Sequence, residues 1–148
     1  MKQQSCSKLD KRVISIARNV RRRIERLAKK PAYSTSPKYL DCMCAIASYA
    51  LYNELKKLGY KDVSFVEGQC KWLTNNDNAN HCWVTLDGHI IDLTFTQFDT
   101  TARKVSVFKT SNVLFKQVRT NKKALNAIEK NWPPEQRPTA LLQEYTAA

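Results

Sequence analysis

Two short apolar segments joined by Asp87-Gly88 constrain the fold of this chain more than any other feature of its sequence. The segment His81–Leu86 precedes the dipeptide, and His89–Leu93 follows it. Asp-Gly is typical of the two-residue type I′ turn, whose twist matches that of a β-hairpin. Such a turn fixes the register and sets Val84 opposite Ile91. The sequence therefore predicts an antiparallel hairpin over these residues.

Side chains alternate along each strand and paired residues share a face, so this hairpin has two different sides. One side is mostly apolar and suits a core; it holds Cys82, Val84, Leu86, His89, Ile91 and Leu93. The other side holds His81, Trp83, Thr85, Ile90, Asp92 and Thr94. On that side His81 and Asp92 are diagonal neighbours, roughly 5–8 Å apart at Cβ and within reach of a side-chain hydrogen bond.

A carboxylate bonded to one imidazole nitrogen fixes the tautomer of the ring and leaves the other nitrogen free to accept a proton. The pair needs a nucleophile. Cys44 is the candidate, because a thiol in the first turn of a helix gains thiolate character. His89 shares no face with Asp92, so the geometry selects His81. We predict that Cys44, His81 and Asp92 are catalytic, although each residue taken alone is more often structural.

Three further residues are candidates for the surroundings of this site. Trp83 shares the face of His81, and we expect it to shield the His81–Asp92 pair or line a substrate pocket, or else simply to pack in the core. Thr94 and Gln97 are expected to hydrogen-bond around Asp92 and to contact substrate. No cofactor and no metal is expected.

A zinc site is the alternative chemical interpretation of this region. Its donors are Cys42, Cys44, Cys70, Cys82 and His81. Structural zinc sites usually combine two pairs of ligands with two to four residues between the members of a pair. Here the first two cysteines are separated by one residue and Cys70 stands alone, so the spacing disfavours zinc.

Helical and strand-like patterns surround the hairpin. A helix is expected to begin at Ser36-Pro37, or after a cap at Asp41, and to end at Gly59. If it begins at the proline, its dipole contributes little at Cys44, and His81 must activate the thiol. Its inward face is predicted to hold Cys44, Ala47, Ser48, Leu51, Leu55 and Leu58. The other expected elements are strands at 62–67 and 105–108, a loop at 75–80, and helices at 121–130 and 138–145.

The order of these elements predicts a single α+β domain over residues 1–148. Helices come first, an antiparallel sheet follows and helices return, which argues against alternating βαβ units. The expected parts are a basic amphipathic helix at 1–31, a catalytic helix-plus-sheet core at 38–110 and C-terminal helices at 120–148. A chain of 148 residues is a usual size for one core.

Basic charge is concentrated in the first expected helix. Of the net charge of +12, residues 1–31 contribute eleven Lys or Arg against two acidic residues. Apolar residues recur there at steps of three and four from Val13 to Ala28, so a helix places its arginines on the other side. These are Arg18, Arg21, Arg22, Arg23 and Arg26. They are candidates for contacts with nucleic acid or an acidic partner; the alternative is an ordinary solvated helix face.

Nothing in the sequence indicates export or a membrane span. The N-terminus lacks an apolar region followed by a cleavage pattern, and the longest uncharged apolar stretch, 42–53, is too short to span a bilayer. Five cysteines, an odd number, favour reduced thiols over a disulfide framework. We therefore expect a cytoplasmic protein.

The order and spacing of these motifs resemble the transglutaminase-like cysteine superfamily. The matching segments are Cys44 to the Leu-Gly that ends at Gly59, the run His81-Cys-Trp-Val, and Asp92-Leu-Thr94. That superfamily places a nucleophilic Cys at a helix start, a His-x-Trp-Val on a strand and an Asp-x-Thr on the next strand. The likeness covers residues 40–98. One departure is Cys82, where a small Ala often stands, and it puts a second thiol near the site.

The resemblance implies a transglutaminase-like or papain-like fold, in which a nucleophile helix packs on a small antiparallel sheet. Cys44 would be the nucleophile, His81 the general base and acid, and Asp92 the group that orients His81. The implied activity is that of a cysteine hydrolase or acyltransferase, similar to transglutaminases and lasso-peptide leader peptidases, acting through a thioester on amide bonds of a protein or peptide. The alternative function is a non-enzymatic binding protein that contacts nucleic acid or an acidic partner through its first helix.

Overall fold

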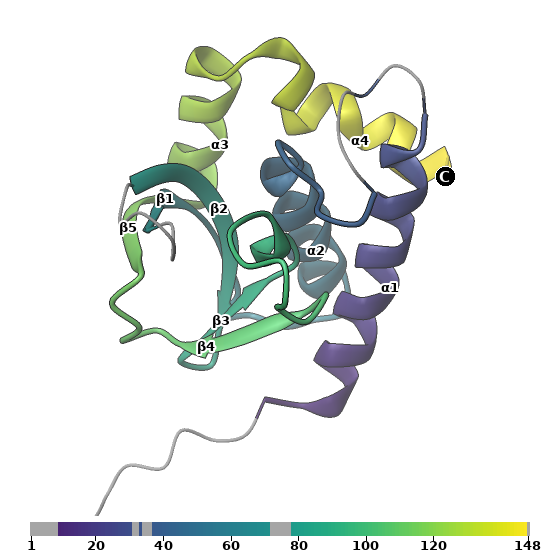
Figure 1. Ribbon diagram of the computed structural model, residues 1–148. Coiled ribbons are helices and arrows are strands. Elements are labelled where there is room, and N and C mark those ends of the chain that lie inside the picture. The colour runs from purple at the N-terminus through teal and green to yellow at the C-terminus, as the bar shows by residue number, and fades with distance from the viewer. Residues whose placement is uncertain (1–8, 31–32, 34–36, 72–77, 148) are drawn as a thin grey trace, which may run out of the picture.

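The computed structural model describes residues 9–30, 33, 37–71 and 78–147. Within them the chain forms four α-helices and a five-stranded antiparallel sheet of strand order β4-β3-β2-β1-β5, which confirms the predicted α+β class (Figure 1). The strands are β1 (Ser64–Lys71), β2 (Asn78–Leu86), β3 (His89–Asp92), β4 (Ser106–Lys109) and β5 (Phe115–Thr120). The helices are α1 (Lys11–Ala28), α2 (Cys44–Lys57), α3 (Asn121–Asn131) and α4 (Pro138–Ala147), with 3₁₀ turns η1 (Phe95–Gln97) and η2 (Pro134–Gln136).

The predicted hairpin is formed by β2 and β3. Asp87 and Gly88 have φ angles of 51° and 76°, and positive φ at both central residues is what a type I′ turn requires. Val84 pairs with Ile91, so the predicted register is confirmed. The two sides of the hairpin also differ as predicted: Val84 enters the core beneath the helices, whereas Trp83 packs on the opposite side.

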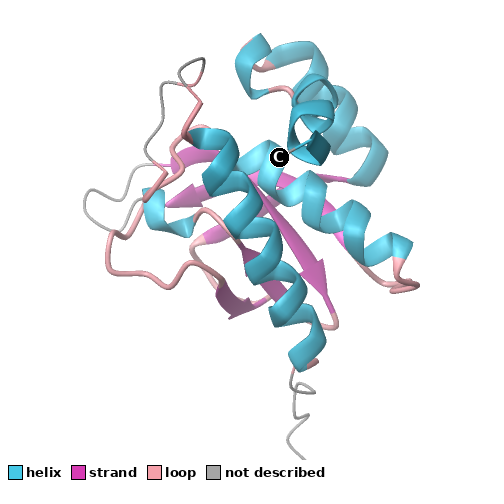
Figure 2. Ribbon diagram, turned by 90° about the vertical axis from the view of Figure 1, so that its right-hand side faces the viewer, coloured by secondary structure: helices cyan, strands magenta, loops and turns pink. Residues whose placement is uncertain are grey.

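The helices α1, α2 and α4 pack against one another on one side of the sheet, and Figure 2 shows helices in front of the strands. The core that they enclose includes Val13, Val20, Ile24, Leu51, Leu55, Val84 and Ile91. Helix α3 packs on β1 and β5 instead. Away from α2, aromatic side chains form a second cluster: Trp83, Phe95, Phe98, Phe108 and Phe115.

Helix α1 is shorter than the predicted basic helix. It is capped by Asp10, whose carboxylate accepts a hydrogen bond of 2.9 Å from the backbone N–H of Arg12. Residues 1–8 and 31 of the predicted helix lie outside the described residues. The predicted apolar stripe is buried, from Val13 to Ala28. Neither α1 nor any other helix of the described residues is long and apolar enough to cross a membrane.

Helix α2 begins at Cys44, later than either predicted start. Leu40 and Cys42 have φ angles of 56° and 64°, and a right-handed helix cannot pass through residues in this left-handed conformation. Asp41 consequently does not cap the helix, and Ser36 lies outside the described residues. Cys44 is the first residue of α2, where the positive end of the helix dipole acts on its side chain.

Helix α2 ends at the predicted glycine. Gly59 has a φ angle of 96°, and its N–H donates to the carbonyl of Lys56 while the N–H of Tyr60 donates to the carbonyl of Leu55. These two bonds define a Schellman cap. The predicted inward face is buried except at Leu58, which is 53% exposed because it follows the last helical residue and lies beyond the packed turns.

The sheet is larger than the sequence predicted. β1 ends four residues beyond its expected end at Glu67. It pairs with β2 on one side and with β5 on the other, and β5 was not predicted. Asn78–Asn80 belong to β2 rather than to a loop, and residues 75–77 lie outside the described residues. Gly68 permits the close approach of β5, since a Cβ atom there would lie 2.1 Å from the carbonyl oxygen of Lys116. Strand β4 and helices α3 and α4 lie within two residues of their predicted bounds.

Candidate active site

His81 and Asp92 form a hydrogen-bonded pair across the β2–β3 hairpin. The distance from Nε2 of His81 to Oδ2 of Asp92 is 2.6 Å, and both side chains are fully buried. His81 lies on β2 and Asp92 is the last residue of β3. The predicted contact between the two residues is therefore confirmed.

Thr94 holds the other oxygen of the Asp92 carboxylate. Its backbone N–H donates to Oδ1 at 2.9 Å, and its hydroxyl lies 3.4 Å from the same oxygen. A carboxylate bonded at both oxygens keeps a fixed orientation, and it fixes the His81 ring in turn. Thr94 is itself buried, and its predicted hydrogen bond to Asp92 is confirmed. Its predicted contact with substrate stays a prediction.

Cys44 lies beside both the Cys82 thiol and the His81 ring. The hydrogen bond from Cys82 is the largest influence on its pKa; together with His81 it overcomes the opposing effect of burial and lowers the pKa of Cys44 to about 5. Cys82 belongs to the same buried cluster as Cys44, on the side of the sheet that α2 covers. These hydrogen bonds favour the thiolate form of the Cys44 sulfur.

His81 carries the complementary charge. Burial alone would lower its pKa, but the Asp92 carboxylate and the Cys44 sulfur more than offset this effect and raise the pKa to about 10. The lowered pKa of Cys44 and the raised pKa of His81 together favour a thiolate beside an imidazolium. Nε2 bonds Asp92, so Nδ1 is the ring nitrogen left for Cys44, and the side-chain nitrogen of Gln97 lies 3.3 Å from it.

A cavity of about 190 Å³ opens beside Cys44. Gln97 lines it, so this predicted residue does reach the site. The cavity adjoins a second one of about 320 Å³, and both are lined by Asn80, Asn131 and Trp132. Sequence reasoning missed the last two because they come from the end of α3, far along the chain. Their signal was the Trp-Pro-Pro run at Trp132, which stops a helix and fixes an aromatic side chain next to it.

Trp83 does not line this cavity. It is buried against Val66 and Ile90, with its ring centroid 5.9 Å from that of His81 and 5.0 Å from that of Phe115. Phe98 lies on the imidazole edge-on, with the centroids 4.7 Å apart. Trp83 is therefore packed beside the buried His81–Asp92 pair, which agrees with the predicted shielding or packing role and not with a place in the lining of this cavity.

The remaining thiols differ sharply from Cys44. The four described cysteines are free; partial desolvation and the neighbouring Cys44 raise the pKa of Cys42, and burial brings that of Cys70 to about 12. Cys42 is exposed and lines the same cavity as Cys44. Among the described residues, no three His, Cys, Asp or Glu side chains are grouped as ligands for a metal ion.

One of the five arginines that were expected on the exposed side of α1 is not exposed. Arg21 is buried, and it donates hydrogen bonds to the carbonyl of Leu93 at 2.7 Å, the hydroxyl of Thr96 at 3.1 Å and the carbonyl of Lys38 at 2.7 Å. Its Nε also pairs with Glu25. The prediction that Arg21 contacts a partner is wrong, because this side chain ties α1 to the segment that follows Asp92. Arg23 is partly buried and binds Glu54, while Arg18, Arg22 and Arg26 are exposed.

Comparison with known proteins adds no relative: no family model, no curated protein and no solved structure matches this chain. The function is therefore inferred from the geometry of the site itself. Its central elements are Cys44 at a helix start and the buried His81–Asp92 pair.

Proposed function

We propose that this protein is a cysteine hydrolase or acyltransferase that acts on amide bonds of a protein or peptide through a thioester intermediate. The observation that carries the proposal is the 2.6 Å contact between His81 and Asp92, with the Cys44 sulfur beside the same ring. A thiolate, an imidazolium and an orienting carboxylate are the groups that nucleophilic acyl transfer by cysteine requires.

In this mechanism the Cys44 thiolate attacks the carbonyl carbon of the amide, and the C=O electron pair moves to the oxygen. The tetrahedral intermediate then collapses as the C–N bond breaks, and the Nδ1 proton of His81 passes to the leaving amine. Neutral His81 next removes a proton from water or from an acceptor amine, which attacks the thioester. Release of the acid or of the new amide restores the thiolate–imidazolium pair. Asp92 does not touch substrate and acts by positioning His81.

Two groups are suited to stabilise the oxyanion. The backbone N–H of Cys44 belongs to the first turn of α2, whose N–H groups have no partner within the helix. The side-chain amide of Gln97 lines the same cavity as Cys44. Donors preorganised at such a position contribute most of the electrostatic stabilisation in acyl transfer.

The cleft favours an extended substrate over a small one. The two adjoining cavities run from Cys44 past Trp132 to Glu67 and Arg119, which are joined by an ion pair of 3.0 Å. An extended peptide advances about 3.3 Å per residue, so a cleft that continues beyond the cavity beside Cys44 favours a peptide over a small amide. A transglutaminase-like fold is part of the proposal and is supported by the arrangement of Cys44 on a helix that packs against β2 of an antiparallel sheet.

Acylation by p-nitrophenyl acetate tests the proposal without knowledge of the natural substrate. We expect a burst of p-nitrophenol equal to the enzyme concentration and an acetyl group on Cys44 in the peptide map. Cys44→Ala abolishes the burst, whereas the matched variant Cys42→Ala, at the exposed thiol of the same cavity, retains it. Adding glycine ethyl ester then separates transfer to an amine from transfer to water. A burst that persists in Cys44→Ala contradicts the proposal.

A further inference from the structure

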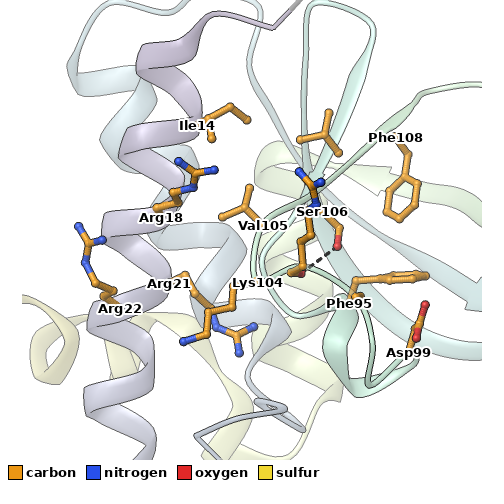
Figure 3. A pocket seen from close by; sticks show the side chains of 13 residues that line it. Ile14, Arg18, Arg21, Arg22, Phe95, Asp99, Lys104, Val105, Ser106 and Phe108 are labelled. Carbon is orange, nitrogen blue, oxygen red and sulfur yellow. Dashed lines mark hydrogen bonds between the residues drawn. The ribbon is translucent and has the colours of Figure 1, made fainter.

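A third cavity, of about 1070 Å³, lies between α1 and the segment that leads from η1 into β4. It shares no lining residue with the cavity beside Cys44. Figure 3 shows Ile14 and Arg18 projecting from α1 towards the side that carries Val105 and Ser106. We call this cavity the α1–β4 groove. The mechanism at Cys44 uses none of its residues.

The α1–β4 groove has an excess of positive charge. Arg18, Arg22 and Arg103 line it and are exposed, and in the described part of the chain none of the three has an ion-pair partner. Lys104 also lines it but binds Glu25 at 3.0 Å. The one acidic lining residue, Asp99, accepts its hydrogen bonds from Thr101. Unpaired guanidinium groups along one groove favour an anionic occupant.

The opposite wall of the groove is an edge strand. Ser106–Phe108 line the groove, and β4 pairs with β3 on one side only. An edge strand presents unpaired N–H and C=O groups, to which an extended peptide adds as a further strand. Apolar side chains between the strand and α1, namely Ile14 and Val105, suit alternate apolar residues of such a peptide.

Nucleic acid fits this groove less well. Binding of single strands relies on aromatic faces on which bases stack. The two aromatic side chains that line the groove, Phe95 and Phe108, are packed against each other at 4.9 Å between centroids and against Phe115. Their rings are engaged within the protein.

We infer that the α1–β4 groove binds an extended protein segment in which acidic and apolar residues alternate. The acidic side chains meet Arg18, Arg22 and Arg103, and the peptide backbone pairs with β4. This inference goes beyond the proposed function and does not depend on the chemistry at Cys44. If both hold, the groove is a docking site for a protein partner or substrate at a distance from the bond that is cleaved.

Fluorescence anisotropy with the labelled peptide Glu-Val-Asp-Leu-Glu-Val-Asp-Leu tests the inference on the full chain. We expect binding that weakens with salt and is lost for the Gln-Val-Asn-Leu-Gln-Val-Asn-Leu counterpart. The variant Arg18→Glu/Arg103→Glu should weaken binding at least about tenfold. The matched variant Lys122→Glu/Lys123→Glu makes the same change of net charge at two exposed residues of α3 and should change binding less than about twofold.

Amide hydrogen exchange supplies an independent readout of the same complex. Pairing with the peptide should slow exchange in Ser106–Lys109 at least about tenfold. The inference is overturned if the acidic peptide does not bind, or if the two charge-reversal variants lose binding equally. It is also overturned if exchange in β4 is unchanged on binding while an oligothymidylate displaces the peptide. Iodoacetamide labelling of Cys44 in the same variants reports on the proposed function separately, because both charge-reversal variants should label at the wild-type rate.

Discussion

Nε2 of His81 lies 2.6 Å from Oδ2 of Asp92, although the two residues are eleven positions apart and belong to different strands. The two-residue turn at Asp87-Gly88 creates this contact, since it sets the register in which the two side chains share a face. Thr94 then fixes the carboxylate by bonding its second oxygen. A short local signal in the sequence thus determines the geometry of the proposed catalytic base.

Replacing Asp92 by Asn should reduce the reactivity of Cys44. The amide keeps the shape of the side chain but loses the negative charge, so the raised pKa of His81 falls and the imidazolium that stabilises the thiolate is lost. We expect the rate of iodoacetamide labelling of Cys44 at pH 7 to fall at least about tenfold. Asp99→Asn, at an acidic residue of the next segment, is the control. A labelling rate in Asp92→Asn within about twofold of wild type would show that Asp92 does not act on the site.

Replacing Cys82 distinguishes its hydrogen bond from its packing. The Cys82 thiol is the largest cause of the lowered pKa of Cys44, so Cys82→Ala should shift the midpoint of the labelling profile to higher pH. Cys82→Ser keeps a donor of similar size and should shift it less. The measurement is the pH dependence of Cys44 labelling in each variant. Equal midpoints in wild type and Cys82→Ala would show that Cys82 does not lower the pKa of Cys44.

Replacing Arg21 should destabilise the fold. Arg21→Ala leaves the buried carbonyl of Leu93 without its bond and removes one of the two ion-pair partners of Glu25, the other being Lys104; an unsatisfied buried acceptor costs about 1–3 kcal/mol. The neighbouring exposed Arg22→Ala should change the free energy of unfolding by less than about 0.5 kcal/mol. Urea unfolding followed by circular dichroism measures both. Similar small losses in the free energy of unfolding of the two variants would mean that the buried hydrogen bonds of Arg21 contribute little to stability.

Replacing Gly68 by Ala should detach β5 from β1. The added methyl group would lie 2.1 Å from the carbonyl oxygen of Lys116, so the strands must separate, at a cost of about 1–3 kcal/mol. Amide exchange should accelerate in Phe115–Thr120 and remain slow in the β2–β3 hairpin, which does not pair with β5. Uniform acceleration across the sheet would show instead that β5 and the hairpin unfold as one unit.

The features of the fold that depend on a few adjacent residues could be predicted from the sequence. Asp87-Gly88 and Gly59 require positive φ, and each marks its turn or helix end. His81 and Asp92 followed from the hairpin register, and Cys44 from its predicted place in the first turn of a helix. The start of α2 did not follow, because it depends on left-handed conformations at Leu40 and Cys42, residue types that rarely adopt them. Strand β5 was missed because it is an edge strand whose side chains are mostly exposed, so it lacks a clear alternating pattern.

Contacts between distant segments account for the other differences. A helical projection places every arginine of α1 outside, yet Arg21 is buried because the carbonyls of Leu93 and Lys38 and the hydroxyl of Thr96 meet it there. Trp132 joins the cavity of Cys44 only because α3 packs on β1 and β5. The burial of Arg21 has no signal within α1, and the Trp-Pro-Pro run at Trp132 marks the end of α3 but not the cavity that Trp132 reaches.

The pH dependence of iodoacetamide labelling at Cys44 tests the thiolate–imidazolium pair most directly. The pKa of Cys44 is lowered to about 5, so its labelling should rise through that pH and already be near its plateau at pH 7. The pKa of His81 is raised to about 10, so loss of the imidazolium should change the rate again only near that pH. Cys42, whose pKa is raised, serves as the internal control and should react slowly below pH 8. At pH 6 we expect Cys44 to label at least about tenfold faster than Cys42; a rate no faster than that of Cys42 would contradict the account.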